Sequence, residues 1–103
     1  MSIFSKLFGG NSGDSKAGAV IGDPVAYEGY LIEATPMPAD SQWRLAGVIV
    51  KETDGGRLER TFVRADLFAS REEAGSFAVR KGQQIIDEQG DRLFADGSGT
   101  GRA

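Results

Sequence analysis

The 103-residue chain contains no cysteine and no histidine, and these two absences exclude much of protein chemistry. Without cysteine there is no disulfide framework and no thiolate metal site. Without histidine the chain lacks the commonest metal ligand and a frequent general base. A catalytic site would have to use carboxylates, lysine, tyrosine or serine, and no such constellation is recognisable. We therefore expect a protein that is not an enzyme, with no cofactor, no metal site and no small-molecule substrate.

The chain also lacks a long apolar run and an excess of positive charge. No stretch approaches the ~18 apolar residues of a membrane span. The apolar start Met1–Phe8 is too short for a signal peptide, so we expect a cytoplasmic protein. The net charge is -3, whereas nucleic-acid-binding domains usually carry surplus lysine and arginine. The negative net charge argues against polyphosphate binding as the main role of the chain, but it does not exclude one basic face.

Composition divides the chain into four segments. Residues 1–8 are a short amphipathic apolar segment, and residues 9–23 are rich in glycine and serine, which is typical of a flexible linker. Residues 24–94 are expected to form a single domain, and the glycine-rich residues 95–103 a disordered tail. A domain of about 70 residues lies near the size at which one core is only marginally stable.

The N-terminal segment carries a one-sided apolar stripe. Its residues at helical spacing are Ile3, Phe4, Leu7 and Phe8. A helix of this length is not stable alone, because the free-energy cost of helix nucleation is offset only in helices of ~12 residues or more. The stripe is therefore expected to dock on its own domain or on a partner protein. Docking on a membrane surface is less favoured, because one or two turns with a single lysine make a weak interfacial anchor.

Alternating apolar residues predict three strands, at 27–35, 42–53 and 57–65. Asp54-Gly55-Gly56 predicts a hairpin turn between the last two, because glycine supplies the positive φ that such turns need. Gly29 is interpreted as a candidate bulge in the first strand. The middle strand has apolar residues at both its odd and its even positions (both parities), so both of its faces are apolar. This indicates a strand covered on both faces or central in its sheet.

A capping box, with Ser70 as N-cap and Glu73 at the third helical position, predicts a helix that runs to about Gln89. Within it, Gly75 and Gly82 each cost about 1 kcal/mol relative to alanine, which indicates close approach of the helix to the sheet or to another chain. The predicted fold is α+β: a three-stranded antiparallel β-meander followed by one long amphipathic helix (β-β-β-α), with an optional short N-terminal helix.

The candidate binding face lies on the predicted hairpin and combines basic residues with one aromatic ring. Its members are Arg44, Arg57, Arg60, Phe62 and Arg64. Arginines interleaved with an aromatic residue on an open sheet suit single-stranded nucleic acid, whose phosphates pair with arginine and whose bases stack on rings. The alternative is a solvated sheet face whose arginine stems cover apolar surface.

Five segments carry a family resemblance. They are Tyr27-Glu28-Gly29-Tyr30, Trp43-Arg44-Leu45-Ala46-Gly47, Arg64-Ala65-Asp66, Ser70-Arg71-Glu72-Glu73-Ala74 and the block from Lys81 to Phe94. Together they resemble the bacterial HlyU-like family, whose members are named as transcriptional activators of haemolysin expression. The resemblance covers residues 27–94, and the apolar opening is similar too. It implies a small, non-enzymatic, cytoplasmic regulator of transcription and no particular binding residues.

Two hypotheses about function remain open from the sequence. The first is a DNA-associated regulator that binds through the arginine-bearing strand face or acts as a homodimer. The second is a protein-interaction module with no direct DNA contact. Such a module would add a partner strand at an open sheet edge or dock the N-terminal stripe in a partner's groove.

Overall fold

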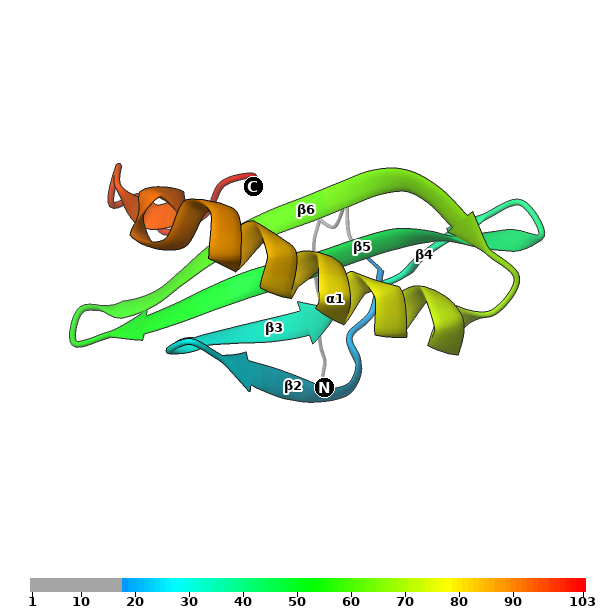
Figure 1. Cartoon of the computed structure of the whole chain (residues 1–103), viewed down its shortest axis with the longest axis horizontal. Coiled ribbons are helices and arrows are strands. Elements are labelled where there is room, and N and C mark those ends of the chain that lie inside the picture. The colour runs from blue at the N-terminus through cyan, green and yellow to red at the C-terminus, as the bar shows by residue number, and fades with distance from the viewer. Residues whose placement is uncertain (1–17) are drawn as a thin grey trace, which may run out of the picture.

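The computed structural model describes residues 18–103, which form an antiparallel sheet with one long helix laid across a face (Figure 1). The elements in chain order are β2 (Ile21–Tyr27), β3 (Tyr30–Ala34), β4 (Met37–Ala39), β5 (Gln42–Thr53), β6 (Gly56–Phe68), α1 (Arg71–Gln89) and the 3-10 helix η2 (Gly90–Phe94). The predicted α+β class is confirmed. The predicted stripe Ile3, Phe4, Leu7 and Phe8 lies outside the described residues.

Strand β5 is the centre of the sheet. Along one edge it pairs with β3, from Leu31 opposite Val50 onward, and then with the short β4. Along its other edge it pairs with β6 over almost its whole length, and β2 pairs with the outer edge of β3. This central position explains why β5 is apolar on both parities.

The sheet has five strands, where the sequence predicted three. Glu28 and Gly29, with φ of 52° and 87°, form a two-residue turn between β2 and β3, so Gly29 is a turn residue and not a bulge. Part of β2 lies in the segment predicted to be a linker, because an edge strand tolerates Pro24. The short β4 follows Pro36 and pairs with the start of β5.

The C-terminal residues also differ from the expected disordered tail. Backbone amides of Glu59 and Thr61 donate to the carbonyls of Gly99 and Gly101, and the Ala103 amide donates back to Thr61, at 2.8–2.9 Å. Residues 99–103 thus line the outer edge of β6, with a parallel bridge at Thr61. Glycine-rich composition suggested disorder, but backbone hydrogen bonds to a free strand edge do not depend on side chains.

Helix α1 begins and ends where its sequence signals place it. The Ser70 hydroxyl accepts a hydrogen bond from the Glu73 amide at 3.0 Å, and the helix ends at Gln89. The predicted close approach of the helix is to the sheet. A Cβ on Gly82 would lie 2.7 Å from Ile32 Cγ2, and one on Gly75 would lie 2.6 Å from Ile21 Cδ1. No helix among residues 18–103 is long and apolar enough to cross a membrane.

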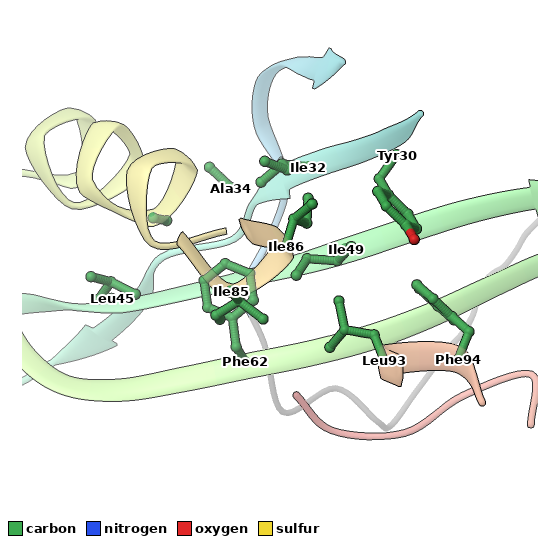
Figure 2. Close-up of a cluster of buried hydrophobic side chains, with 11 residues drawn as sticks. Tyr30, Ile32, Ala34, Leu45, Ile49, Phe62, Ile85, Ile86, Leu93 and Phe94 are labelled. Atoms are coloured by element: carbon green, nitrogen blue, oxygen red, sulfur yellow. The ribbon is translucent and has the colours of Figure 1, made fainter. Parts of the chain in front are cut away.

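The core lies between α1 and the sheet and continues under η2 (Figure 2). Its buried members are Tyr30, Ile32, Ala34, Leu45, Ile49, Phe62, Ala78, Ile85, Ile86, Leu93 and Phe94. Leu93 and Phe94 belong to η2 and pack into this core. The helix is therefore fixed to the sheet along most of its length.

Candidate partner and nucleic-acid interface

The predicted binding face is divided by the structure. In β6, Arg60 lies opposite Ile49 and Phe62 lies opposite Gly47, so both point to the side of the sheet that α1 covers. Arg60 is 2 % exposed and Phe62 is 1 % exposed. Neither side chain is available to bases or phosphates. The expectation of an exposed surface that includes these two residues is therefore corrected.

Arg60 instead anchors the C-terminal residues. Its Nε donates to the Leu93 carbonyl at 2.6 Å, and Nη1 donates to the carbonyls of Glu59 at 2.6 Å and Ser98 at 3.1 Å. Its Nη2 pairs with Asp96 Oδ1 at 2.8 Å. The Ser98 backbone amide and then the Arg60 guanidinium hold the pKa of Asp96 below its ordinary value. Every polar contact of this arginine is internal, which marks it as a structural residue.

Arg57 is exposed, but two carboxylates already surround it. Its Nη2 lies 2.9 Å from Glu33 Oε2, and its Nε lies 2.7 Å from Glu59 Oε2. Both acids lie on the sheet face away from α1, since alternate residues of a strand point to opposite faces. A guanidinium paired in this way offers little net positive charge to a phosphate.

Arg44 and Arg64 are half-buried. Arg44 pairs across the sheet with Leu67 on one side and Met37 on the other. Arg64 donates from Nη1 to the carbonyl of its neighbour Val63 at 3.0 Å. The five predicted residues are therefore not brought together into one basic face.

A different surface does combine arginines with aromatic rings. It lies where β5 begins, β6 ends and α1 begins, and we call it the aromatic–arginine surface; its residues are Trp43, Phe68, Arg71, Phe77 and Arg80. Trp43 lies opposite Phe68 in the sheet, and Phe68 stacks on Phe77 of α1 with ring centroids 4.9 Å apart. The guanidinium carbon of Arg71 lies 5.7 Å from the Trp43 ring centre, and that of Arg80 lies 5.3 Å from the Phe77 ring centre.

The chain reaches this arrangement through a short connection. Only Ala69 and Ser70 separate the end of β6 from the start of α1, so the first turns of the helix must lie beside the strand ends. This surface was not predicted from the sequence, because its residues come from three separate elements and not from one strand pair. The short connection was the available signal, since it places Arg71 near Phe68 in any fold of this type.

The aromatic–arginine surface remains accessible. Phe77 is 39 % exposed and is one of the few large exposed hydrophobic side chains of residues 18–103. The nearest carboxylate to Arg71 is that of Glu72 at 4.0 Å, and Arg80 has no ion pair within that part of the chain. Rings with guanidinium groups over them suit a partner that offers both acidic and apolar groups.

The other end of α1 is acidic. Asp87 accepts a hydrogen bond from the Tyr27 hydroxyl at 2.8 Å, and Asp91 accepts one from the Tyr30 hydroxyl. Lys51 lies 3.6 Å from Asp91. The Tyr30 hydroxyl and then Lys51 lower the pKa of Asp91. These carboxylates are used within the fold, and residues 18–103 contain no cluster suited to a metal ion.

The geometry describes a small α+β domain with an exposed aromatic–arginine surface and no assembled catalytic group among the described residues. Comparison with protein-family models matches residues 2–94 to the model described as "Transcriptional activator HlyU". The match spans most of the chain, and the protein therefore belongs to the HlyU family. No curated protein and no solved structure matches the chain significantly.

Proposed function

We propose that this chain regulates transcription by binding and not by catalysis, and that the aromatic–arginine surface is its contact site for a partner protein. The supporting observation is the exposed stack of Phe68 and Phe77 with Arg80 over it. Aromatic residues and arginine are enriched at the centres of protein interfaces, where they contribute most of the binding energy. The HlyU family assignment supports the regulatory role.

The chemistry of the surface defines the partner. Arg71 and Arg80 present two guanidinium groups at the rim of the rings. A complementary surface would place a carboxylate against each guanidinium and an apolar side chain on Phe77. The charge pairs would act mainly on association rate and specificity, and the aromatic contact on affinity.

Direct DNA binding is the second candidate. It is favoured by Arg64, Arg71 and Arg80, none of which pairs with a carboxylate closer than 4.0 Å in residues 18–103. Against it stand the net charge of -3, the burial of Arg60 and the paired state of Arg57. A DNA-binding mode would neutralise few phosphates, and its affinity would depend only weakly on salt.

The experiment that separates the candidates is binding to mixed-sequence double- and single-stranded DNA across a salt series. The variant Arg71→Gln/Arg80→Gln tests the assigned surface, and Arg57→Gln is the matched control. A partner-protein mechanism predicts no DNA binding at low salt, where electrostatic attraction is strongest. DNA binding that the double variant weakens and Arg57→Gln does not, with a shallow salt dependence, would replace the first candidate with the second.

A further inference from the structure

The sheet has a second apolar face, opposite to the one that α1 covers. Its side chains come from β3, β5 and β6, and they alternate with the core residues Ile49 and Phe62. We call it the second face; its apolar residues are Leu31, Ala46, Val48, Val50 and Val63. Ala46 and Val50 are both 0 % exposed, and Val48 is 9 % exposed.

No described element lies across this face. Within residues 18–103, α1 is the only α-helix longer than one or two turns, and it lies on the opposite side of the sheet (Figure 1). A strand that is apolar on both faces is typical of a sheet covered on both sides. Residues 1–17 or another molecule would provide such a cover.

We propose that residues 1–8 dock on the second face as a short amphipathic helix, with Phe4 and Phe8 packed against Val48 and Val50. The stripe formed by Ile3, Phe4, Leu7 and Phe8 is apolar on one side only, and a segment of this length needs an apolar surface to become helical. This docking is independent of the proposed regulatory function and completes the fold as a helix–sheet–helix arrangement.

The tether allows the docking. Residue 18, where the described chain begins, is held beside the second face: the Gly18 amide donates to the Thr35 carbonyl at 3.1 Å, and the Thr35 amide donates to the Ala46 carbonyl at 2.9 Å. Ten residue steps separate Gly18 from Phe8, which span at most about 35 Å when extended. A short glycine-rich linker raises the effective concentration of the segment to the millimolar range, so a weak contact suffices.

A polar group at the rim fits the same occupant. The Thr35 hydroxyl beside Gly18 is buried and has no hydrogen-bond partner among residues 18–103. The incoming chain would supply a polar group near Thr35.

The direct test uses a single spin label, because the natural chain has no cysteine. A nitroxide on Ser5→Cys, on the polar side of the stripe, should broaden methyl signals of Leu31, Val48 and Val63 more than those of Ile85 on the helix-covered side. Equal broadening of both groups, or none, would overturn the proposal. Mixing labelled chain with unlabelled, isotope-enriched chain should give no broadening, whereas broadening there would assign the face to a second copy.

A stability comparison supplies an independent readout. Phe4→Asp/Phe8→Asp should lower the thermal unfolding midpoint of the full chain by several degrees, because it exposes the second face. Ser2→Asp/Ser5→Asp makes the same charge change on the polar side of the stripe and should leave the midpoint unchanged. Equal midpoints for the two variants would contradict docking. Docking would also be contradicted if the natural chain binds anionic phosphatidylserine vesicles and Phe4→Asp/Phe8→Asp abolishes this binding without lowering the unfolding midpoint.

Discussion

An arginine lies over a phenylalanine ring at two places, beyond the C-terminal end of α1 and near the middle of α1, and the surroundings give the two pairs different roles. The guanidinium of Arg60 lies 4.7 Å from the Phe94 ring centre, and that of Arg80 lies 5.3 Å from the Phe77 ring centre. Arg60 donates to three backbone carbonyls, those of Glu59, Leu93 and Ser98, and to the Asp96 carboxylate. Arg80 has no ion pair within residues 18–103, and its ring partner Phe77 is 39 % exposed. The same pair of residue types is structural where the backbone encloses it and accessible where it does not.

The largest expected effect comes from removing the enclosed guanidinium. Arg60→Met keeps the apolar stem but leaves the buried carbonyl of Leu93, and the partly buried Ser98 carbonyl, without their donor. We expect a loss of about 3 kcal/mol in the free energy of unfolding, measured by urea denaturation. Arg80→Met is the matched change in the other arginine–phenylalanine pair and should stay within about 0.5 kcal/mol of the natural chain. Equal losses would mean that the two pairs do not differ.

The next effect concerns the two helix glycines. Gly82→Ala should cost about 1–2 kcal/mol, because the new methyl group meets Ile32 Cγ2 in the packed core. Gly75→Ala should be near neutral, because its contact is the end of the half-buried Ile21 side chain, which can rotate away, and alanine favours the helix by about 1 kcal/mol. Denaturation midpoints of the two variants test this difference. A larger loss for Gly75→Ala would show that the first turns are packed as tightly as the middle.

The hydrogen bond between Tyr30 and Asp91, beside the acidic end of α1, makes the free energy of unfolding depend on pH in the alkaline range. Burial, and then the hydrogen bond to Asp91, raises the pKa of Tyr30 from 10.0 to about 12. Folding thus favours the protonated phenol, whose contribution is complete below about pH 10 and is lost as the pH rises toward about 12. The unfolding free energy of the natural chain should fall across this window, and Tyr30→Phe should fall less steeply. Parallel curves for the two proteins would contradict this role of Tyr30.

The smallest effect belongs to the exposed arginine of the same strand as Arg60. Arg57→Gln removes two ion pairs at the surface, where the side chain of Arg57 is 44 % exposed. Exposed pairs contribute about 0–1 kcal/mol, so the loss should be well below that of Arg60→Met. Adding salt should reduce the difference between Arg57→Gln and the natural chain. A loss as large as that of Arg60→Met would show that the paired charges stabilise the sheet.

Much of the fold could be predicted from local patterns. The Asp54-Gly55 turn, the N-cap Ser70, the end of α1 and the close approach at Gly82 each follow from a few neighbouring residues, and all are observed. The two additional strands were missed, because β4 is only three residues long and β2 contains Pro24. Glu28 takes a positive φ that a non-glycine residue rarely adopts, so the turn before β3 was not predicted from the sequence.

The candidate site was predicted less well, for a physical reason. Leu58, Arg60 and Phe62 share one parity in β6, so the sequence could have placed Arg60 on the apolar side of this strand. The sequence did not show which groups pair with Arg60, because three of the four are the backbone carbonyls of Glu59, Leu93 and Ser98. Carbonyls have no side-chain signature. The aromatic–arginine surface is likewise a product of tertiary contacts among three elements.

The most direct test of a regulatory role of the aromatic–arginine surface is transcript profiling in the source organism. A strain lacking the gene would be complemented with the natural chain, with Arg71→Gln/Arg80→Gln, or with Arg57→Gln, all at matched protein levels. We predict that the double variant folds normally but fails to restore the transcript profile, whereas Arg57→Gln restores it. Full restoration by the folded double variant would show that the aromatic–arginine surface does not carry the regulatory function.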